Sequence, residues 1–167
     1  MKRRAMIVMA GAAMLALTAL SATGSAQRTQ ERTVTVFEKD SAETFVPVDL
    51  PPTSKTKGAR ATVSAGDLFI VTGPVFGDAA GKTRIGRIFG QVTAVSTGKT
   101  FFRSSFLVHL VFTLSGGTIV VDGAFKEEGT TAEFAVTGGT GAYAGARGTF
   151  SSKHAKAGES DTIDLLP

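Results

Sequence analysis

Residues 135–150 read Ala-Val-Thr-Gly-Gly-Thr-Gly-Ala-Tyr-Ala-Gly-Ala-Arg-Gly-Thr-Phe, and this stretch is the most informative part of the 167-residue chain. An apolar segment leads into residues 138–141, and a second segment leaves with glycine at positions 145 and 148. Glycine supplies the positive φ angles that a tight hairpin needs. Glycine within a strand also lets a neighbouring backbone approach closely, or bends a sheet at a barrel corner. The stretch therefore predicts a strongly curved antiparallel hairpin.

On both sides of this hairpin, short apolar segments alternate with turn residues, and almost no segment has helical periodicity. A long connection, 40–60, contains Pro47, Pro51 and Pro52 and separates the first two expected strands. The expected strands are 33–39, 67–76, 83–96, 100–114, 118–126, 131–137, 143–156 and 161–165. Eight such strands form a sandwich or a closed barrel, and a barrel is favoured because closure leaves no unpaired edge. We therefore expect an all-β fold, an eight-stranded antiparallel up-and-down β-barrel.

The longest expected strand, 100–114, has one clearly apolar face. Alternate side chains of a strand point to opposite sides. The even face carries Phe102, Phe106, Val108, Leu110, Phe112 and Leu114, interrupted only by Ser104. The odd face is mixed, with Arg103 and His109 among apolar residues. This pattern predicts that the even face is packed, either inside the barrel or against another subunit.

The first 26 residues have the composition of a secretory signal peptide. Basic residues 2–4 precede a largely apolar run over 5–20, and small residues follow up to Ala26. The apolar run is short for a bilayer-spanning helix, so a retained membrane anchor is the weaker interpretation. We expect cleavage after Ala26, secretion to the extracellular space or the cell envelope, no stable membrane anchor afterwards, and a single domain over 27–167.

Charge and composition exclude several classes of partner. Removal of residues 1–26 leaves 15 basic residues against 14 acidic ones, and the basic residues are scattered along the chain. A nucleic-acid-binding protein concentrates such residues on one face, so no nucleic-acid partner is expected. The chain has no Cys and only two histidines, His109 and His154, so neither a disulfide nor a metal site is expected. Phosphate-loop spacing is absent at 77–83 and 98–100, and no cofactor is expected.

The order of several motifs resembles the allene oxide cyclase and dirigent families, which share one barrel type. The motifs are Gly66-Asp67-Leu68, Gly86-x-x-x-Gly90, Gly117-Thr118-Ile119-x-Val121-x-Gly123, and Val136-x-Gly138-Gly139-Thr140-Gly141 followed by Gly145 and Gly148. The resemblance covers residues 33–165. It implies an eight-stranded antiparallel barrel, a trimer or dimer of barrels with a homotrimer expected, and an internal pocket for a small hydrophobic molecule. The side chains expected to line that pocket are Val36, Phe69, Val92, Phe102 and Phe106.

The resemblance also points to two catalytic positions. The segment 37–40, Phe-Glu-Lys-Asp, resembles the first-strand segment in which plant cyclases carry a cavity Glu and, two residues on, an Asn. Glu38 matches the Glu, and Asp40 stands in place of the Asn. Plant cyclases also carry a cavity Cys where this chain has Val92-Thr93, and plant dirigents an Arg where it has Ala124. The catalytic positions implied here are Glu38 and Asp40.

Two interpretations of Glu38 remain open. In an apolar cavity, loss of hydration raises the pKa of its carboxyl, which then serves as a general acid or base or stabilises a developing positive charge. Otherwise Glu38 is a surface carboxylate beside Lys39. Asp40 lies on the same strand face and either shares a proton with Glu38 or begins a loop. Asp122, in mid-strand, is expected to pair with Arg103 or Arg147.

These observations favour two functions from different classes. The first is a secreted binding protein of the dirigent type, which orients a hydrophobic ligand and directs its stereochemistry without making or breaking bonds. The second is an isomerase or cyclase of the allene oxide cyclase type, in which the cavity holds a reactive hydrophobic intermediate and Glu38 supplies the key carboxyl. A purely structural barrel is the third possibility.

Overall fold

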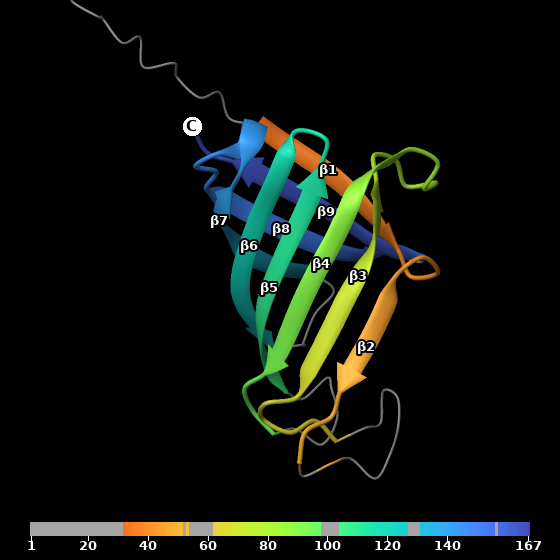
Figure 1. The fold of residues 1–167 in the computed structure, drawn as a ribbon, viewed down its shortest axis with the longest axis vertical. Helices are drawn as coiled ribbons and strands as arrows, with labels where there is room; N and C mark the ends of the chain where they lie inside the picture. Colours follow the sequence, from red (N-terminus) through yellow and green to blue (C-terminus); the bar gives the residue numbers. More distant parts are fainter. Residues whose placement is uncertain (1–31, 52, 54–61, 98–103, 127–130, 156) are drawn as a thin grey trace, which may run out of the picture.

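The computed structural model describes residues 32–167 except 52, 54–61, 98–103, 127–130 and 156. Within this part of the chain, the strands form one antiparallel sheet in the order β1-β9-β8-β7-β6-β5-β4-β3-β2. They are β1 (Arg32–Lys39), β2 (Thr44–Val48), β3 (Leu68–Phe76), β4 (Arg84–Ala94), β5 (Ser105–Leu114), β6 (Gly117–Lys126), β7 (Thr131–Gly139), β8 (Gly148–Ala155) and β9 (Gly158–Leu165). β1 also pairs with β3, which closes the sheet into a barrel. Figure 1 shows β3 to β6 in front, with β1, β8 and β9 crossing behind them.

β1 and β2 both pair with β3, at different parts of its length, and together they take the place of one strand in the barrel wall. β2 pairs with the first part of β3, where Val46 lies opposite Ile70, and β1 reaches the end of β3, where Phe37 lies opposite Phe76. The predicted eight-stranded barrel is therefore confirmed. The prediction of a long connection over 40–60 is wrong in one respect, because this segment contains the strand β2. Pro47 is tolerated in β2 because this strand lies at the end of the strand order and pairs only with β3.

The barrel interior is lined by apolar side chains, many of them aromatic. Phe106 and Phe112 on the even face of β5 are fully buried, so the packed face predicted for this strand is confirmed and lies inside the barrel. Phe102 lies outside the described residues. Ring centroids are 5.9 Å apart for Phe69–Phe106, 5.3 Å for Phe106–Phe125, 5.9 Å for Phe125–Phe134 and 5.7 Å for Phe134–Phe150. Such contacts stabilise a core beyond the area that they bury.

The glycine-rich stretch turns the chain over more residues than a tight hairpin does. β7 continues to Gly139, the short 3-10 helix η3 (Gly141–Tyr143) follows, and β8 begins only at Gly148. The strand expected over 143–156 therefore starts later than predicted. Positive φ angles are present at Gly141 (61°), Gly145 (73°) and Gly148 (153°). This confirms the prediction that glycines supply positive φ angles in this stretch.

The described strands enclose one interior, in which two clusters of buried apolar residues both contact Val92 and Phe125. Residues 1–26, the expected signal peptide, lie outside the described part of the chain. Within that part, no helix has the length and apolar character needed to cross a membrane.

Replacement of Gly158 by Ala is expected to destabilise the barrel by more than about 3 kcal/mol. Gly158 has a φ of +150°, and a Cβ there would overlap the backbone carbonyl oxygen of Glu38 on β1. Denaturant unfolding followed by circular dichroism measures the change. Gly138→Ala is the matched control, since Gly138 has no positive φ and nothing within 4 Å of the added Cβ. Equal stability of both variants would contradict the close packing of β9 on β1.

Candidate functional site

Glu38 points into the barrel from β1. Side chains alternate along a strand, and Val36, two residues earlier on the same face, is fully buried in the core. In the pairing of β1 with β9, Glu38 lies opposite Glu159 and Val36 lies opposite Asp161. The interior position of Glu38 thus follows from the same pairing that closes the barrel.

The residue that meets Glu38 inside the barrel is Asp161. Its side chain is fully buried, and in the ionised form neither carboxylate oxygen has a hydrogen-bond donor of standard geometry among the described residues. The Glu38 and Asp161 carboxyls are placed to share a hydrogen bond when one of them is protonated, whereas two ionised carboxylates cannot form one. A proton held by Glu38 supplies the missing donor. We call Glu38 and Asp161 the acid pair.

Burial and mutual repulsion raise the pKa of both members of the acid pair. Loss of hydration, the hydrogen bond with Asp161 and the charges of Asp161, Glu43 and Glu159 together raise the pKa of Glu38 to about 10. Burial raises the pKa of Asp161 to about 6, although its contacts with Glu38 and Ser152 oppose this shift. At neutral pH the pair therefore holds one proton and one negative charge between its two carboxyls.

Two further carboxyls extend the acid pair toward solvent. Glu43, after the turn between β1 and β2, has its pKa raised to about 7 by burial and by the charges of Glu159, Asp40 and Asp161. Ser152 on β8 donates a hydrogen bond to Glu159, and His154 Nδ1 lies 3.8 Å from the Glu159 carboxylate. We call Glu38, Glu43, Glu159 and Asp161 the acidic cluster.

The structure places the two predicted catalytic residues differently. Glu38 is inside the barrel, whereas Asp40 lies in the exposed turn after β1, where its backbone N–H bonds to Ala157. Asp161, rather than Asp40, forms the hydrogen bond with Glu38. Sequence reasoning missed Asp161, but a signal was present, because Asp161, Ile163 and Leu165 alternate on the buried face of β9.

Four of the predicted pocket residues belong to the barrel interior. Val36, Phe69 and Phe106 are buried, and Val92 packs against the core while partly exposed. Phe102, the fifth, is outside the described part of the chain. The acid pair lies beside this apolar interior, since Ser152 and Phe150 are neighbours on the inner face of β8 and Ser152 is directly opposite Asp161.

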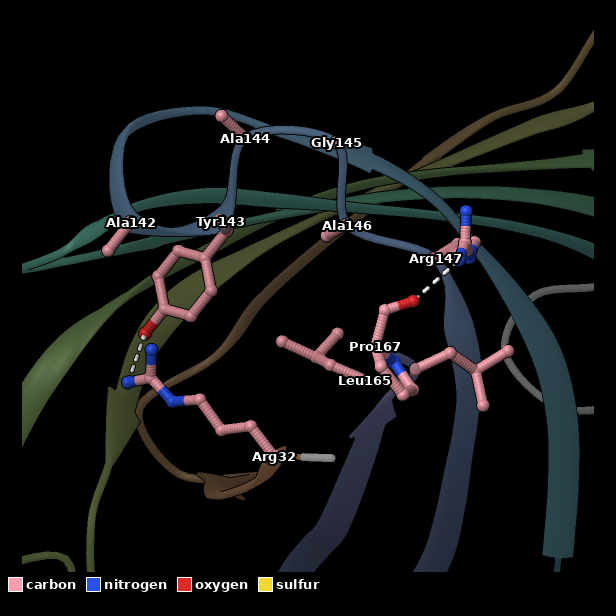
Figure 2. A pocket seen from close by; sticks show the side chains of 10 residues that line it. Arg32, Ala142, Tyr143, Ala144, Gly145, Ala146, Arg147, Leu165 and Pro167 are labelled. Carbon is pink, nitrogen blue, oxygen red and sulfur yellow. Dashed lines mark hydrogen bonds between the residues drawn. The ribbon is translucent and has the colours of Figure 1, made fainter. Parts of the chain in front are cut away.

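A surface hollow lies at the start of β1, at the opposite end of this strand from Glu38. It has a volume of about 330 Å³ and is lined by η3, the following loop, Arg32 and residues 165–167. The Arg32 guanidinium lies 4.9 Å from the centre of the Tyr143 ring, and Arg147 donates a hydrogen bond to the Pro167 carbonyl (Figure 2). This hollow contains none of the residues predicted from the sequence to form the site.

Asp122 is on the outer surface and does not form the expected pair with Arg147, which bonds to Pro167 instead. Arg103, the other expected partner, is outside the described residues. Asp122 accepts a hydrogen bond from Thr137 and lies 2.7 Å from His109 Nδ1, and these contacts lower the pKa of its carboxyl. Among the described residues, no group of three or more His, Cys, Asp or Glu side chains is arranged to hold a metal ion.

Comparison with known proteins agrees with this architecture. The family model of the dirigent-like proteins matches residues 20–165, and the chain belongs to this family. No curated protein matches the sequence.

Solved structures of similar fold span several activities. The chain is similar to a pyocyanin demethylase, with a TM-score of 0.62 and 19% identity over 81% of this chain and all of that chain. It is also similar to a pterocarpan synthase dirigent protein, with a TM-score of 0.59 and 18% identity over 83% of this chain and 95% of the other. A Diels-Alderase from Streptomyces koyangensis gives a TM-score of 0.53 and 12% identity over 83% and 71% of the two chains. At these identities the likeness shows the fold alone.

Stability is expected to fall as the pH rises from about 5 to about 8, because the folded barrel holds protons that the unfolded chain releases. A carboxyl whose pKa is higher in the folded than in the unfolded protein contributes its full stability at a pH below the pKa of the unfolded chain. This stability is lost as the pH rises through the pKa values of the folded protein, which are about 6 for Asp161, about 7 for Glu43 and about 10 for Glu38. Asp161→Asn is expected to raise the free energy of unfolding at about pH 8 by about 1–3 kcal/mol, and less at about pH 5.

Chemical denaturation at both pH values measures these differences. Asp164→Asn is the control, because Asp164 is on the exposed face of the same strand, where its carboxylate accepts a hydrogen bond from Thr33. Its effect is expected to stay within about 0.5 kcal/mol at either pH. An Asp161→Asn effect that is the same at both pH values would show that Asp161 is not charged inside the folded barrel.

Proposed function

We propose that this dirigent-like barrel binds a small hydrophobic molecule in its interior and directs the stereochemistry of that molecule's reaction. The observation that carries the proposal is the acid pair, Glu38 and Asp161, beside the chain of buried Phe rings. Ligand sites typically combine apolar walls with a few polar groups that fix orientation. The acid pair provides a fixed polar group, with one proton and one negative charge, beside an otherwise apolar interior.

A second candidate function is an isomerase or cyclase that acts on a hydrophobic reactive intermediate. The specific observation in its favour is that Glu38 holds its proton at neutral pH, because burial raises its pKa to about 10. A carboxyl in this state acts as a general acid toward a substrate oxygen. Asp161 then stabilises the positive charge that develops on the substrate, and the proton returns to Glu38 when the product forms.

We also propose that the mature protein is exported and self-associates as a homotrimer. Export rests on the signal-peptide composition of residues 1–26. Self-association is supported by exposed apolar side chains on the outer surface of β2 to β5, where Phe89 is 48% and Leu107 52% exposed. We call Val46, Val48, Ile70, Phe89 and Leu107 the outer apolar face. Exposed apolar groups of this kind mark interaction surfaces on soluble proteins.

Native mass spectrometry of the protein purified from its producing cells is expected to show three features at once. The subunit mass should correspond to a chain that begins at Gln27, the assembly should be a trimer, and a small molecule should remain bound. Release of that molecule in organic solvent would allow its identification. A trimer without any bound molecule would favour a purely structural barrel.

The variant Phe89→Glu is expected to shift the assembly to monomers, because it places a charge in the outer apolar face. Thr149→Glu is the control, since Thr149 is exposed on the outside of β8, away from this face. A monomeric parent protein, or trimers in both variants, would exclude this face as the interface.

Glu38→Gln separates the two candidate functions once the retained molecule is known. If Glu38 is a general acid, turnover is expected to fall by about tenfold or more, while ligand affinity changes by less than about threefold. Product analysis and equilibrium binding measure the two quantities. Glu133→Gln, on the exposed face of β7, is the matched control. Unchanged turnover, or no turnover in the parent, would exclude the enzyme and leave the binding function.

A further inference from the structure

In the part of the chain that the structure describes, the acidic cluster has no basic partner inside the barrel. Among the described residues, the only basic side chain within ion-pair distance of the cluster is His154, whose Nδ1 lies 3.8 Å from Glu159. Lys39 points away from the cluster, since its Nζ donates a hydrogen bond to the carbonyl of Ala80 in the connection between β3 and β4. Asp40, the remaining charged group near Glu43, is acidic and adds to the repulsion. The cluster is therefore a site of negative potential without a cation of its own.

Asp161 has a buried carboxylate with no cationic partner among the described residues. The Asp161 side chain is fully buried, and its carboxylate has two oxygens that can accept hydrogen bonds. The neighbouring Glu38 carboxyl offers at most one proton to them. A buried carboxylate is strongly unfavourable unless it is paired with a cation or fully hydrogen-bonded. The proton on Glu38 satisfies part of this requirement, and one negative charge remains. A positively charged group brought in by a ligand would satisfy the rest.

The surroundings determine what kind of cation fits. No metal-ion arrangement occurs among the described residues. Aromatic residues share the inner face with the acid pair instead, since Ser152, opposite Asp161, lies two residues from Phe150 on β8. Phe150 in turn stacks on Phe134 at 5.7 Å between centroids. Aromatic faces attract organic cations, and they also hold flat apolar rings.

The acidic cluster runs from exposed to buried positions. Glu159 and His154 have 43% and 59% of their side-chain surface exposed, whereas Asp161 has none. The carboxyls thus extend from the surface to the interior along β9. Attraction toward such a row of like charges raises the local concentration of oppositely charged ligands.

We propose that the ligand of this barrel is a small aromatic molecule that carries a positive charge, and that Asp161 and Glu38 bind the charge while the Phe rings bind its apolar part. The proposal rests on the proposed function, since it specifies the ligand class of the same interior. Cation binding competes with the proton held by the acid pair. Binding therefore releases protons, and affinity rises as the pH rises from about 5 to about 7.5.

The test compares two probes of the same shape that differ only in charge, N-methylquinolinium and its uncharged carbon analogue, methylnaphthalene. Isothermal calorimetry on the mature protein is expected to show at least tenfold tighter binding of the cation at about pH 7.5, a difference of about 1.4 kcal/mol. Titrations in two buffers of different ionisation enthalpy are expected to show proton release. Affinity for N-methylquinolinium should rise with pH, although this probe does not itself titrate.

Variants locate the site. Asp161→Asn is expected to lower cation affinity by about tenfold and to leave methylnaphthalene binding unchanged within about twofold. Asp164→Asn, on the outer face of the same strand, should alter neither. Equal binding of both probes would overturn the charge preference and leave the proposed function intact. Absence of binding by either probe would overturn both. Cation binding that Asp161→Asn does not weaken would place the cation elsewhere and overturn the assignment to the acid pair.

Discussion

Closure of the sheet by β1 is the constraint on which the rest of the structure depends. β1 pairs with β9 along its whole length and reaches β3 at Phe37, so the two ends of the sheet meet through this strand. Side chains alternate along a strand, and the pairing that buries Val36 therefore turns Glu38 inward as well. In an open sheet this face would be hydrated, and the acid pair would have ordinary carboxyl pKa values.

The environment, rather than the residue type, determines how each carboxyl behaves. Asp122 sits on the outside of the barrel, where Thr137 and His109 contact its carboxylate and lower its pKa. Asp161 sits on the inside, where burial outweighs its polar contacts and raises its pKa. An apolar residue at position 161 would continue the alternation with Ile163 and Leu165. The fold thus carries an electrostatic cost at this one position, and such costs concentrate at functional sites.

The sequence predicted the barrel well because its signals are local. Turn glycines and the alternation along β5 are readable within a few residues, whereas β2 was missed because Pro47 in a proline-rich connection argued against a strand. The acid pair was only half predicted for a different reason. Glu38 and Asp161 are far apart in the chain, and their contact depends on the register of β1 with β9. Arg147 was the wrong partner for Asp122 for the same reason, since His109 faces Asp122 only in the register of β5 with β6.

β1 carries a basic residue at each end, and neither of them is placed to neutralise the acid pair. The strand begins with Arg32, beside the hollow of Figure 2, and Glu38 follows six residues later. At about 3.3 Å per residue the two side chains start about 20 Å apart, beyond the screening length of about 8 Å at physiological ionic strength. Arg32 is therefore too distant to neutralise Asp161. With Arg32 out of range and Lys39 bonded to the Ala80 carbonyl, a proton or the proposed cationic ligand would balance the charge of the interior, and competition between them would make its chemistry depend on pH.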